Sequence, residues 1–113
     1  MDEDLAAIMQ RGIDSLVKLE LVLLFDANPD LVDTAQAIAA RLARDMRDVK
    51  FALRALAASD LVNQFELGAG RYVLYSRVES HHTRASIRRL SDVYHGDEQG
   101  RVEIIKKLMR LPT

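Results

Sequence analysis

Residues 34–62 read TAQAIAARLARDMRDVKFALRALAASDLV, and this stretch predicts two short amphipathic helices joined by a tight connection. The first helix is expected over about residues 34–43, where Asp33 and Gln36 have the spacing of a capping box. Its apolar residues follow the i, i+3, i+4, i+7 spacing of a single helix face: Ala35, Ile38, Ala39 and Leu42. This face is therefore expected to pack into a core.

The second helix is expected to begin after Asp45, a good N-cap residue, and to end near Ser59. Asp48 lies in its first turn, where the helix dipole favours a negative charge. The side chains spaced for burial are Val49, Ala52, Leu53 and Leu56.

The opposite side of this helix has an unusual composition. With Val49 in the core, Arg47, Phe51 and Arg54 point away from it and Lys50 lies at the side. A phenylalanine among basic side chains is unusual for a face that meets only water. The pattern indicates contact with a polyanion or with another protein.

Two helices are expected before this stretch, over residues 3–11 and 14–28, the second with Asp14 as its N-cap. The second helix should end before Pro29, and a short extended link follows. Because apolar residues surround this helix almost completely, it should be buried on more than one side. Glu20 falls within its apolar sector and needs a partner such as an arginine.

After residue 59, the segments LVNQFEL and RYVLYS flank the turn GAG and predict a β-hairpin. From about residue 78 the chain is expected to be helical, with an interruption at HGDEQG and a last helix over residues 101–111. The chain lacks a linker long enough to divide domains, so we expect one domain over residues 1–113.

This order of elements resembles the winged helix-turn-helix domain of small prokaryotic regulators of the ArsR, MarR and PadR kind. Thr34 to Leu42 resemble the support helix, Asp45 to Leu56 the recognition helix, and Gly68 to Arg71 the wing tip. The resemblance covers residues 13–75 and implies a mainly α fold with a small β-hairpin, extended by C-terminal helices over residues 78–111. Where the family often has glycine, this chain has Ala43 and Asp60. A left-handed alanine costs about 1–2 kcal/mol, so we expect a reshaped turn at Ala43.

The resemblance also implies a function, the binding of duplex DNA as a transcriptional regulator. The third helix of such domains enters the major groove while the wing lies along the backbone or minor groove. It implies DNA contacts for six residues: Arg44, Arg47, Lys50, Phe51, Arg54 and Arg71. A second hypothesis is a winged-helix protein-interaction module that docks through Phe51. A third is a sensor with a ligand pocket beside the C-terminal helices.

Helices outside the winged core predict a homodimer, since related regulators dimerise through such flanking helices. The candidate interface residues are Ile87, Leu90, Val93, Tyr94, Ile104, Ile105 and Leu108. The alternative is that these helices fold back on their own domain.

The composition limits the metal sites and catalytic groups that the protein can contain. The chain has no cysteine, which excludes disulfides, thiolate metal sites and cysteine nucleophiles. His81 and His82 are adjacent and point about 100° apart in a helix, while His95 with Asp97 and Glu98 is a weak metal motif. We therefore expect no cofactor, no metal site and no enzymatic activity.

The acidic N-terminus does not resemble a secretory signal, and LVLLF is far too short for a membrane span, so a soluble cytoplasmic protein is expected.

Charge is distributed unevenly along the chain. Residues 1–33 contain eight acids and two bases, a balance of −6, whereas residues 41–89 contain ten bases and five acids, a balance of +5. A local basic surface can attract polyanions even though the net charge is −1.

Overall fold

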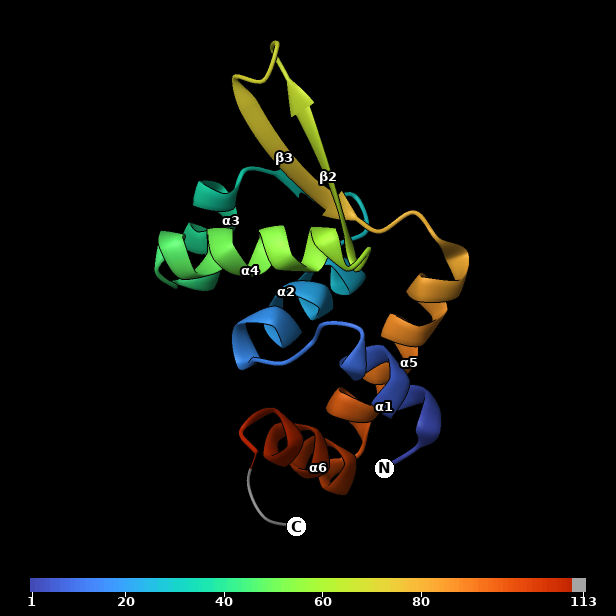
Figure 1. Ribbon diagram of the computed structural model, residues 1–113. Helices are drawn as coiled ribbons and strands as arrows, with labels where there is room; N and C mark the ends of the chain where they lie inside the picture. Colours follow the sequence, from blue (N-terminus) through green and yellow to red (C-terminus); the bar gives the residue numbers. More distant parts are fainter. Residues whose placement is uncertain (111–113) are drawn as a thin grey trace.

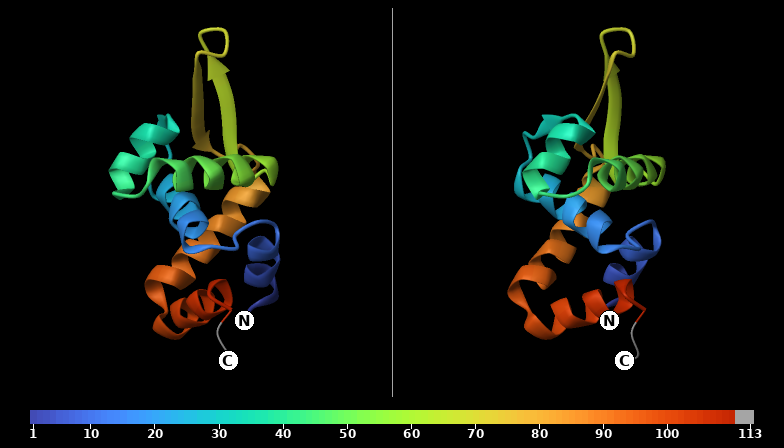
Figure 2. Two further views of the ribbon diagram at one scale, coloured as in Figure 1. Left: turned by 60° about the vertical axis from the view of Figure 1, so that its left-hand side comes forward. Right: turned by 90° about the vertical axis from the view of Figure 1, so that its left-hand side faces the viewer.

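The computed structural model describes residues 1–110, which form six helices and a three-stranded antiparallel sheet (Figure 1). In chain order the elements are α1 (Glu3–Gln10), α2 (Leu16–Ala27), β1 (Val32–Asp33), α3 (Ala35–Leu42), α4 (Met46–Ala58), β2 (Val62–Leu67), β3 (Tyr72–Arg77), α5 (His81–Gly96) and α6 (Glu98–Leu108). The hairpin of β2 and β3 rises from one end of the molecule. Helices α1 and α6 and the N-terminus lie at the opposite end (Figures 1 and 2).

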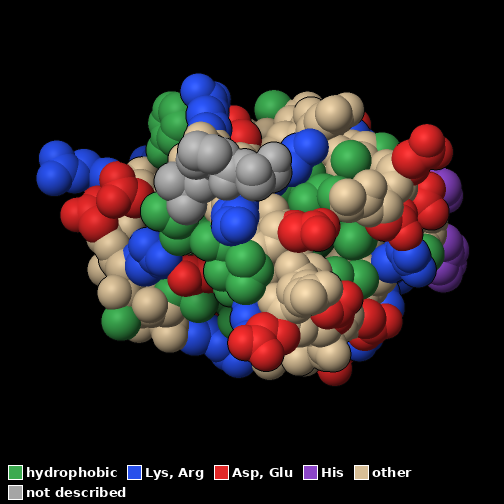
Figure 3. Space-filling view, turned by 90° about the horizontal axis from the view of Figure 1, so that it is seen from below, with side chains coloured by type: hydrophobic (Ala, Val, Ile, Leu, Met, Phe, Trp, Pro, Cys, Tyr) green, Lys and Arg blue, Asp and Glu red, His purple; other side chains and the backbone are tan. Residues whose placement is uncertain are grey.

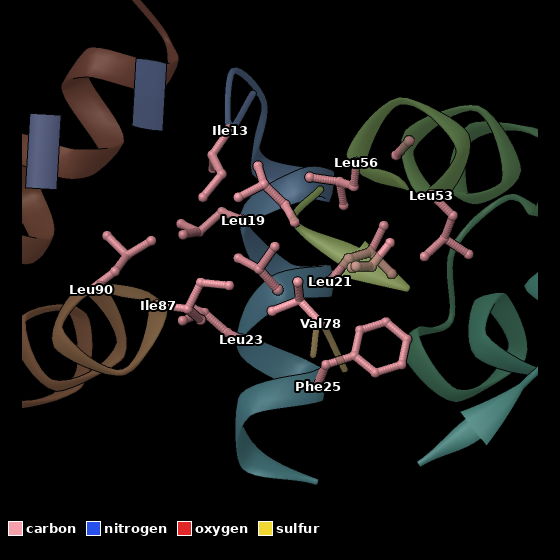
Figure 4. Packing of buried hydrophobic residues seen from close by; sticks show 14 of the residues in the cluster. Ile13, Leu19, Leu21, Leu23, Phe25, Leu53, Leu56, Val78, Ile87 and Leu90 are labelled. Atoms are coloured by element: carbon pink, nitrogen blue, oxygen red, sulfur yellow. The ribbon is translucent and has the colours of Figure 1, made fainter. Parts of the chain in front are cut away.

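Helix α2 occupies the centre of the molecule and packs against α4, α5 and β3. Leu19, Leu21, Val22 and Phe25 of this helix are all buried, as expected for a helix that is apolar on nearly every side. Figure 4 shows Leu53 and Leu56 of α4 on one side of α2, and Ile87 and Leu90 of α5 on another. A single core thus joins the winged domain to the C-terminal helices.

Helices α3 and α4 form as the sequence predicts, and Asp45 caps α4 by accepting hydrogen bonds from the Arg47 and Asp48 N–H groups. Two other predicted caps are wrong. The N-cap of α2 is Ser15 rather than Asp14, because the Ser15 hydroxyl accepts from the Lys18 N–H. The N-cap of α3 is Thr34, whose hydroxyl accepts from the Ala37 N–H, so Asp33 and Gln36 form no capping box.

The turn between α3 and α4 is not reshaped, contrary to the expectation for Ala43. Ala43 adopts the left-handed conformation, with φ 54° and ψ 44°. The Arg44 N–H donates to the Ala39 carbonyl and the Ala43 N–H to the Ala40 carbonyl, which is the Schellman motif that normally has glycine at this position. The two hydrogen bonds satisfy carbonyls at the helix end and hold alanine in a conformation that it otherwise disfavours.

The C-terminus of α4 has the same cap. Asp60 has φ 57°, and the N–H groups of Asp60 and Leu61 donate to the carbonyls of Ala57 and Leu56. Leu61 and Val62 are buried directly after this cap, so the Schellman motif sets the direction in which the chain enters the wing.

The predicted hairpin is confirmed, and a third strand accompanies it. β2 pairs with β3 from Val62↔Arg77 to Leu67↔Tyr72. The two-residue β1 pairs with the other edge of β3, through Val32↔Ser76 and Asp33↔Tyr75, where the sequence predicted only an extended link.

The C-terminal helices fold back on their own chain. α5 packs on α1 and α2, and α6 packs on α5. Only Asp97 separates α5 from α6, so the last helix begins at Glu98, earlier than predicted. Gly100 permits this packing, since a Cβ atom there would lie 2.4 Å from Val93 Cγ1. The predicted end of the last helix, at residue 111, falls outside the described residues.

Candidate nucleic-acid interface

Helix α4 has one buried side and one exposed side. Val49, Ala52, Leu53 and Leu56 are at most 3% exposed, as the sequence predicts. Arg47, Lys50, Phe51 and Arg54 are all exposed, so the structure brings four of the six predicted contact residues together on one helix face. We call these four residues the α4 face.

The two cations nearest the start of the α4 face project into solvent. The side chain of Arg47 is 89% exposed, and its contact with the Asp45 carboxylate is long, at 3.9 Å. Lys50 follows one turn further and is exposed too. Asp45 and Asp48 reduce the local positive potential, although the Asp45 carboxylate is already engaged in capping the helix.

Arg54 extends the α4 face toward the wing. Burial raises the pKa of Tyr75 in β3, while the positive charge of the neighbouring Arg54 acts in the opposite direction. The guanidinium of Arg54 therefore lies beside the Tyr75 hydroxyl, at the junction between α4 and the wing.

Arg44 is engaged in a different interaction. Its Nε and Nη2 atoms donate to the two carboxylate oxygens of Glu20 at 2.5 and 2.8 Å, forming a bidentate ion pair. The hydrogen bond to Glu20 raises the pKa of Arg44. Glu20 thus has the arginine partner that its position in α2 requires, and the pair ties the start of α4 to α2. Arg44 is half-buried and is not part of the α4 face.

The wing tip carries Arg71, which is exposed within the turn Gly68–Arg71. Gly68, Ala69 and Gly70 all have positive φ, which reverses the chain direction between β2 and β3. Glu66 lies close by, with its carboxylate 3.5 Å from the position that a Cβ on Gly70 would occupy. The tip therefore has both charges and is less basic than the α4 face.

Sequence reasoning missed two exposed side chains of the wing. Leu67 and Tyr72 face each other as the last cross-strand pair of the hairpin and are 51% and 52% exposed. The signal was present in the sequence, because a hairpin closed at Gly68–Gly70 necessarily leaves its outermost apolar pair beyond the core.

The expected dimer interface requires a correction. Ile87, Leu90 and Ile104 are 5%, 0% and 0% exposed within a single chain, because α5 packs on α2 and α6 packs on α5. The other four candidates, Val93, Tyr94, Ile105 and Leu108, are partly buried. Seen from below, the end that contains α1 and α6 intermingles hydrophobic, acidic and basic side chains (Figure 3).

Over residues 1–110, no three His, Cys, Asp or Glu side chains gather in a way that would hold a metal ion. Within the same residues, no helix has the length and apolar character needed to cross a membrane.

The chain resembles two solved structures in its fold. Reduced HlyU from Vibrio cholerae N16961 superimposes with a TM-score of 0.61 at 19% sequence identity, covering 80% of this chain and 90% of HlyU. A mutant of ZitR from Lactococcus lactis gives a TM-score of 0.51 at 16% identity, covering 94% of this chain and 88% of ZitR. No protein-family model and no curated protein sequence matches the chain.

The element order, the sheet and these likenesses define the fold of the protein. It is a winged helix-turn-helix fold, mainly α-helical, with α3 and α4 as the helix-turn-helix and β2–β3 as the wing.

Proposed function

We propose that this chain is a transcriptional regulator that binds duplex DNA, with α4 in the major groove and the wing along the backbone. The observation that carries the proposal is the α4 face, which presents Arg47, Lys50 and Arg54 to solvent on the helix that the fold exposes beside the wing. Arginine can bind guanine with two hydrogen bonds, and arginine or lysine can neutralise phosphates. The structural neighbours support the proposal, since both are winged-helix transcriptional regulators.

The individual cations have different proposed roles. Arg47 and Lys50 have the freest side chains and are assigned to the groove and its phosphates. Arg54, beside Tyr75, is placed to contact the backbone where α4 meets the wing. Arg71 at the wing tip is assigned to a flanking phosphate. Arg44 would have to leave Glu20 before it could contact DNA.

The test is fluorescence anisotropy of a labelled mixed-sequence duplex, titrated with protein at several salt concentrations. Each phosphate neutralised contributes about −0.9 to the log–log salt slope. The variant Arg47→Ala/Arg54→Ala is therefore expected to flatten the slope by about 1.8 per bound chain. The matched control Lys106→Ala/Lys107→Ala makes the same charge change on α6, at the opposite end of the molecule. Light scattering checks that this control keeps the oligomeric state of the wild type, and its slope should then be unchanged.

A second candidate function is favoured by the exposure of Phe51, which is 74%. A large exposed aromatic ring surrounded by arginines is also typical of a protein–protein hot spot. In that case the wild type would fail to bind the duplex even at low salt. Equal slopes for the α4 variant and the α6 control would likewise contradict DNA reading by α4.

We also propose that the protein acts as a homodimer through the end that contains α1 and α6. Val102 of α6 is 43% exposed, and the partly buried Ile105 and Leu108 lie on the same helix. Light scattering of the intact chain tests this proposal. Val102→Glu should yield monomers, whereas Val32→Glu, a similarly exposed valine in β1, should not. A wild-type monomer at high concentration would refute the dimer.

A further inference from the structure

Phe51 lies at one edge of the α4 face in projection down the helix, and between Arg47 and Arg54 along the helix axis. Successive helix residues are about 100° apart, so Arg47 and Arg54 lie within about 60° of Phe51, one turn before it and one turn after it. Lys50 lies about 100° away on the same basic side. The phenyl ring is therefore bracketed by cations along the helix axis.

Folding does not account for this side chain. The four buried residues of α4 already connect the helix to α2, α3 and β2, and Phe51 is on the other side. At 74% exposure, Phe51 is the most exposed of the large hydrophobic side chains in the described part of the chain. Its apolar surface gains nothing from the chain's own core, so any stabilising contact must come from a bound molecule.

The chemistry of the major groove limits which contact this can be. Base edges in the groove present hydrogen-bond donors and acceptors, and the thymine C5-methyl is the apolar group among them. Arginines on both sides of the ring would meet guanine edges or phosphates, and the ring between them would meet the floor of the groove. A phenyl ring cannot form a bidentate hydrogen bond with any base, so the methyl is the feature that it can select.

We infer that Phe51 is a specificity-determining residue that reads the C5-methyl group of thymine within the DNA site of α4. The inference rests on the proposed DNA binding and adds the chemical feature recognised. The same group placed on cytosine projects into the groove at the equivalent position, so 5-methylcytosine is expected to substitute for thymine as the contacted methyl.

The test uses a duplex that the wild-type protein selects from a random-sequence pool. Each thymine is replaced in turn by uracil, which removes the methyl and preserves the base-pairing edge. Wild-type affinity is expected to fall about fourfold at each contacted methyl, the effect of one apolar carbon. Phe51→Ala should bind the parent duplex more weakly and show no loss at the same positions. Val32→Ala, an exposed apolar side chain of β1, is the control and should keep the wild-type pattern.

The comparison between the variants separates the methyl contact from the effect of uracil on DNA shape, because any change in shape acts on Phe51→Ala too. If Phe51→Ala retains the fourfold losses, or if the wild type binds with a steep salt slope and shows none, Phe51 does not read the methyl, and DNA binding itself stands. If no duplex is recovered from the pool and none binds at low salt, the proposed function fails together with the inference.

Discussion

Ala43→Gly is expected to stabilise the protein, although replacing alanine by glycine in a helical region normally destabilises it. Ala43 follows the last residue of α3 in the left-handed conformation, with φ 54°. Glycine adopts this conformation without steric cost. The two hydrogen bonds of the Schellman motif come from backbone N–H groups and are retained in the variant.

The size of the effect is the difference between two terms. A left-handed L-residue costs about 1–2 kcal/mol in the folded state, and glycine removes this cost. Glycine also adds conformational entropy to the unfolded chain, which opposes folding by about 0.4–1 kcal/mol. The balance of these two terms should therefore raise the free energy of unfolding by roughly 0.5–1 kcal/mol. This rise corresponds to an increase in Tm of about 2–5 °C.

Urea unfolding monitored by circular dichroism measures the change, with Ala40→Gly as the matched control. Ala40 is an exposed residue inside α3, so glycine there should lower the free energy of unfolding by about 1 kcal/mol. The two substitutions have the same chemistry and opposite expected signs. If Ala43→Gly destabilised the protein as much as Ala40→Gly does, residue 43 could not be in the left-handed conformation and the turn would have another geometry.

Two other predictions concern the N-terminal helices. Ser15→Ala should lower the free energy of unfolding by about 1 kcal/mol because it removes the α2 N-cap. Asp14→Ala should cost clearly less, since Asp14 only pairs with Lys18 at the surface. Equal losses in urea unfolding would contradict the assignment of Ser15 as the cap. The hydrogen bond from Arg89 lowers the pKa of Asp2, so the stabilisation of α1 is present above the ordinary carboxyl pKa and is lost as pH falls below about 4. The protection factors of the α1 amides, which are corrected for the pH dependence of intrinsic exchange, should therefore fall as pH drops below about 4 in the wild type and depend less on pH in Arg89→Ala. Identical profiles would refute the link.

The parts of the fold that the sequence predicted are those with local signals. α3, α4 and the hairpin follow from apolar periodicity, the Asp45 cap and the turn glycines, which act over a few residues. β1 escaped prediction because two residues carry no periodicity, and the pairing partner of this strand is β3, far along the chain. The start of α6 was misplaced because the whole stretch HGDEQG was expected to interrupt the helix, whereas only Asp97 separates α5 from α6 and Gly100 is the point where α6 approaches Val93 of α5.

The candidate site shows the same division between local and distant information. Helical spacing correctly grouped Arg47, Lys50, Phe51 and Arg54 on the exposed side of α4. Periodicity also identified Leu90 and Ile104 as buried, but it cannot tell whether the surface that buries them belongs to the same chain or to a partner. Only the packing of α5 and α6 distinguishes these cases, and it assigns both residues to the core of one chain.

Glu20 and Arg44 show how the need of one residue for a partner can change the role expected of another. Glu20 lies in the apolar sector of α2 and needs an arginine, and Arg44 is a cation beside the start of α4 that could meet a phosphate. In the structure Arg44 and Glu20 form an ion pair with each other, so the charge of Arg44 is neutralised where DNA would approach. The pair ties α4 to α2 at its N-terminal end, and the Schellman cap at Asp60 fixes the chain at its C-terminal end. The position of the α4 face is therefore set from both ends, which leaves Arg47, Lys50 and Arg54 for the proposed contact with DNA.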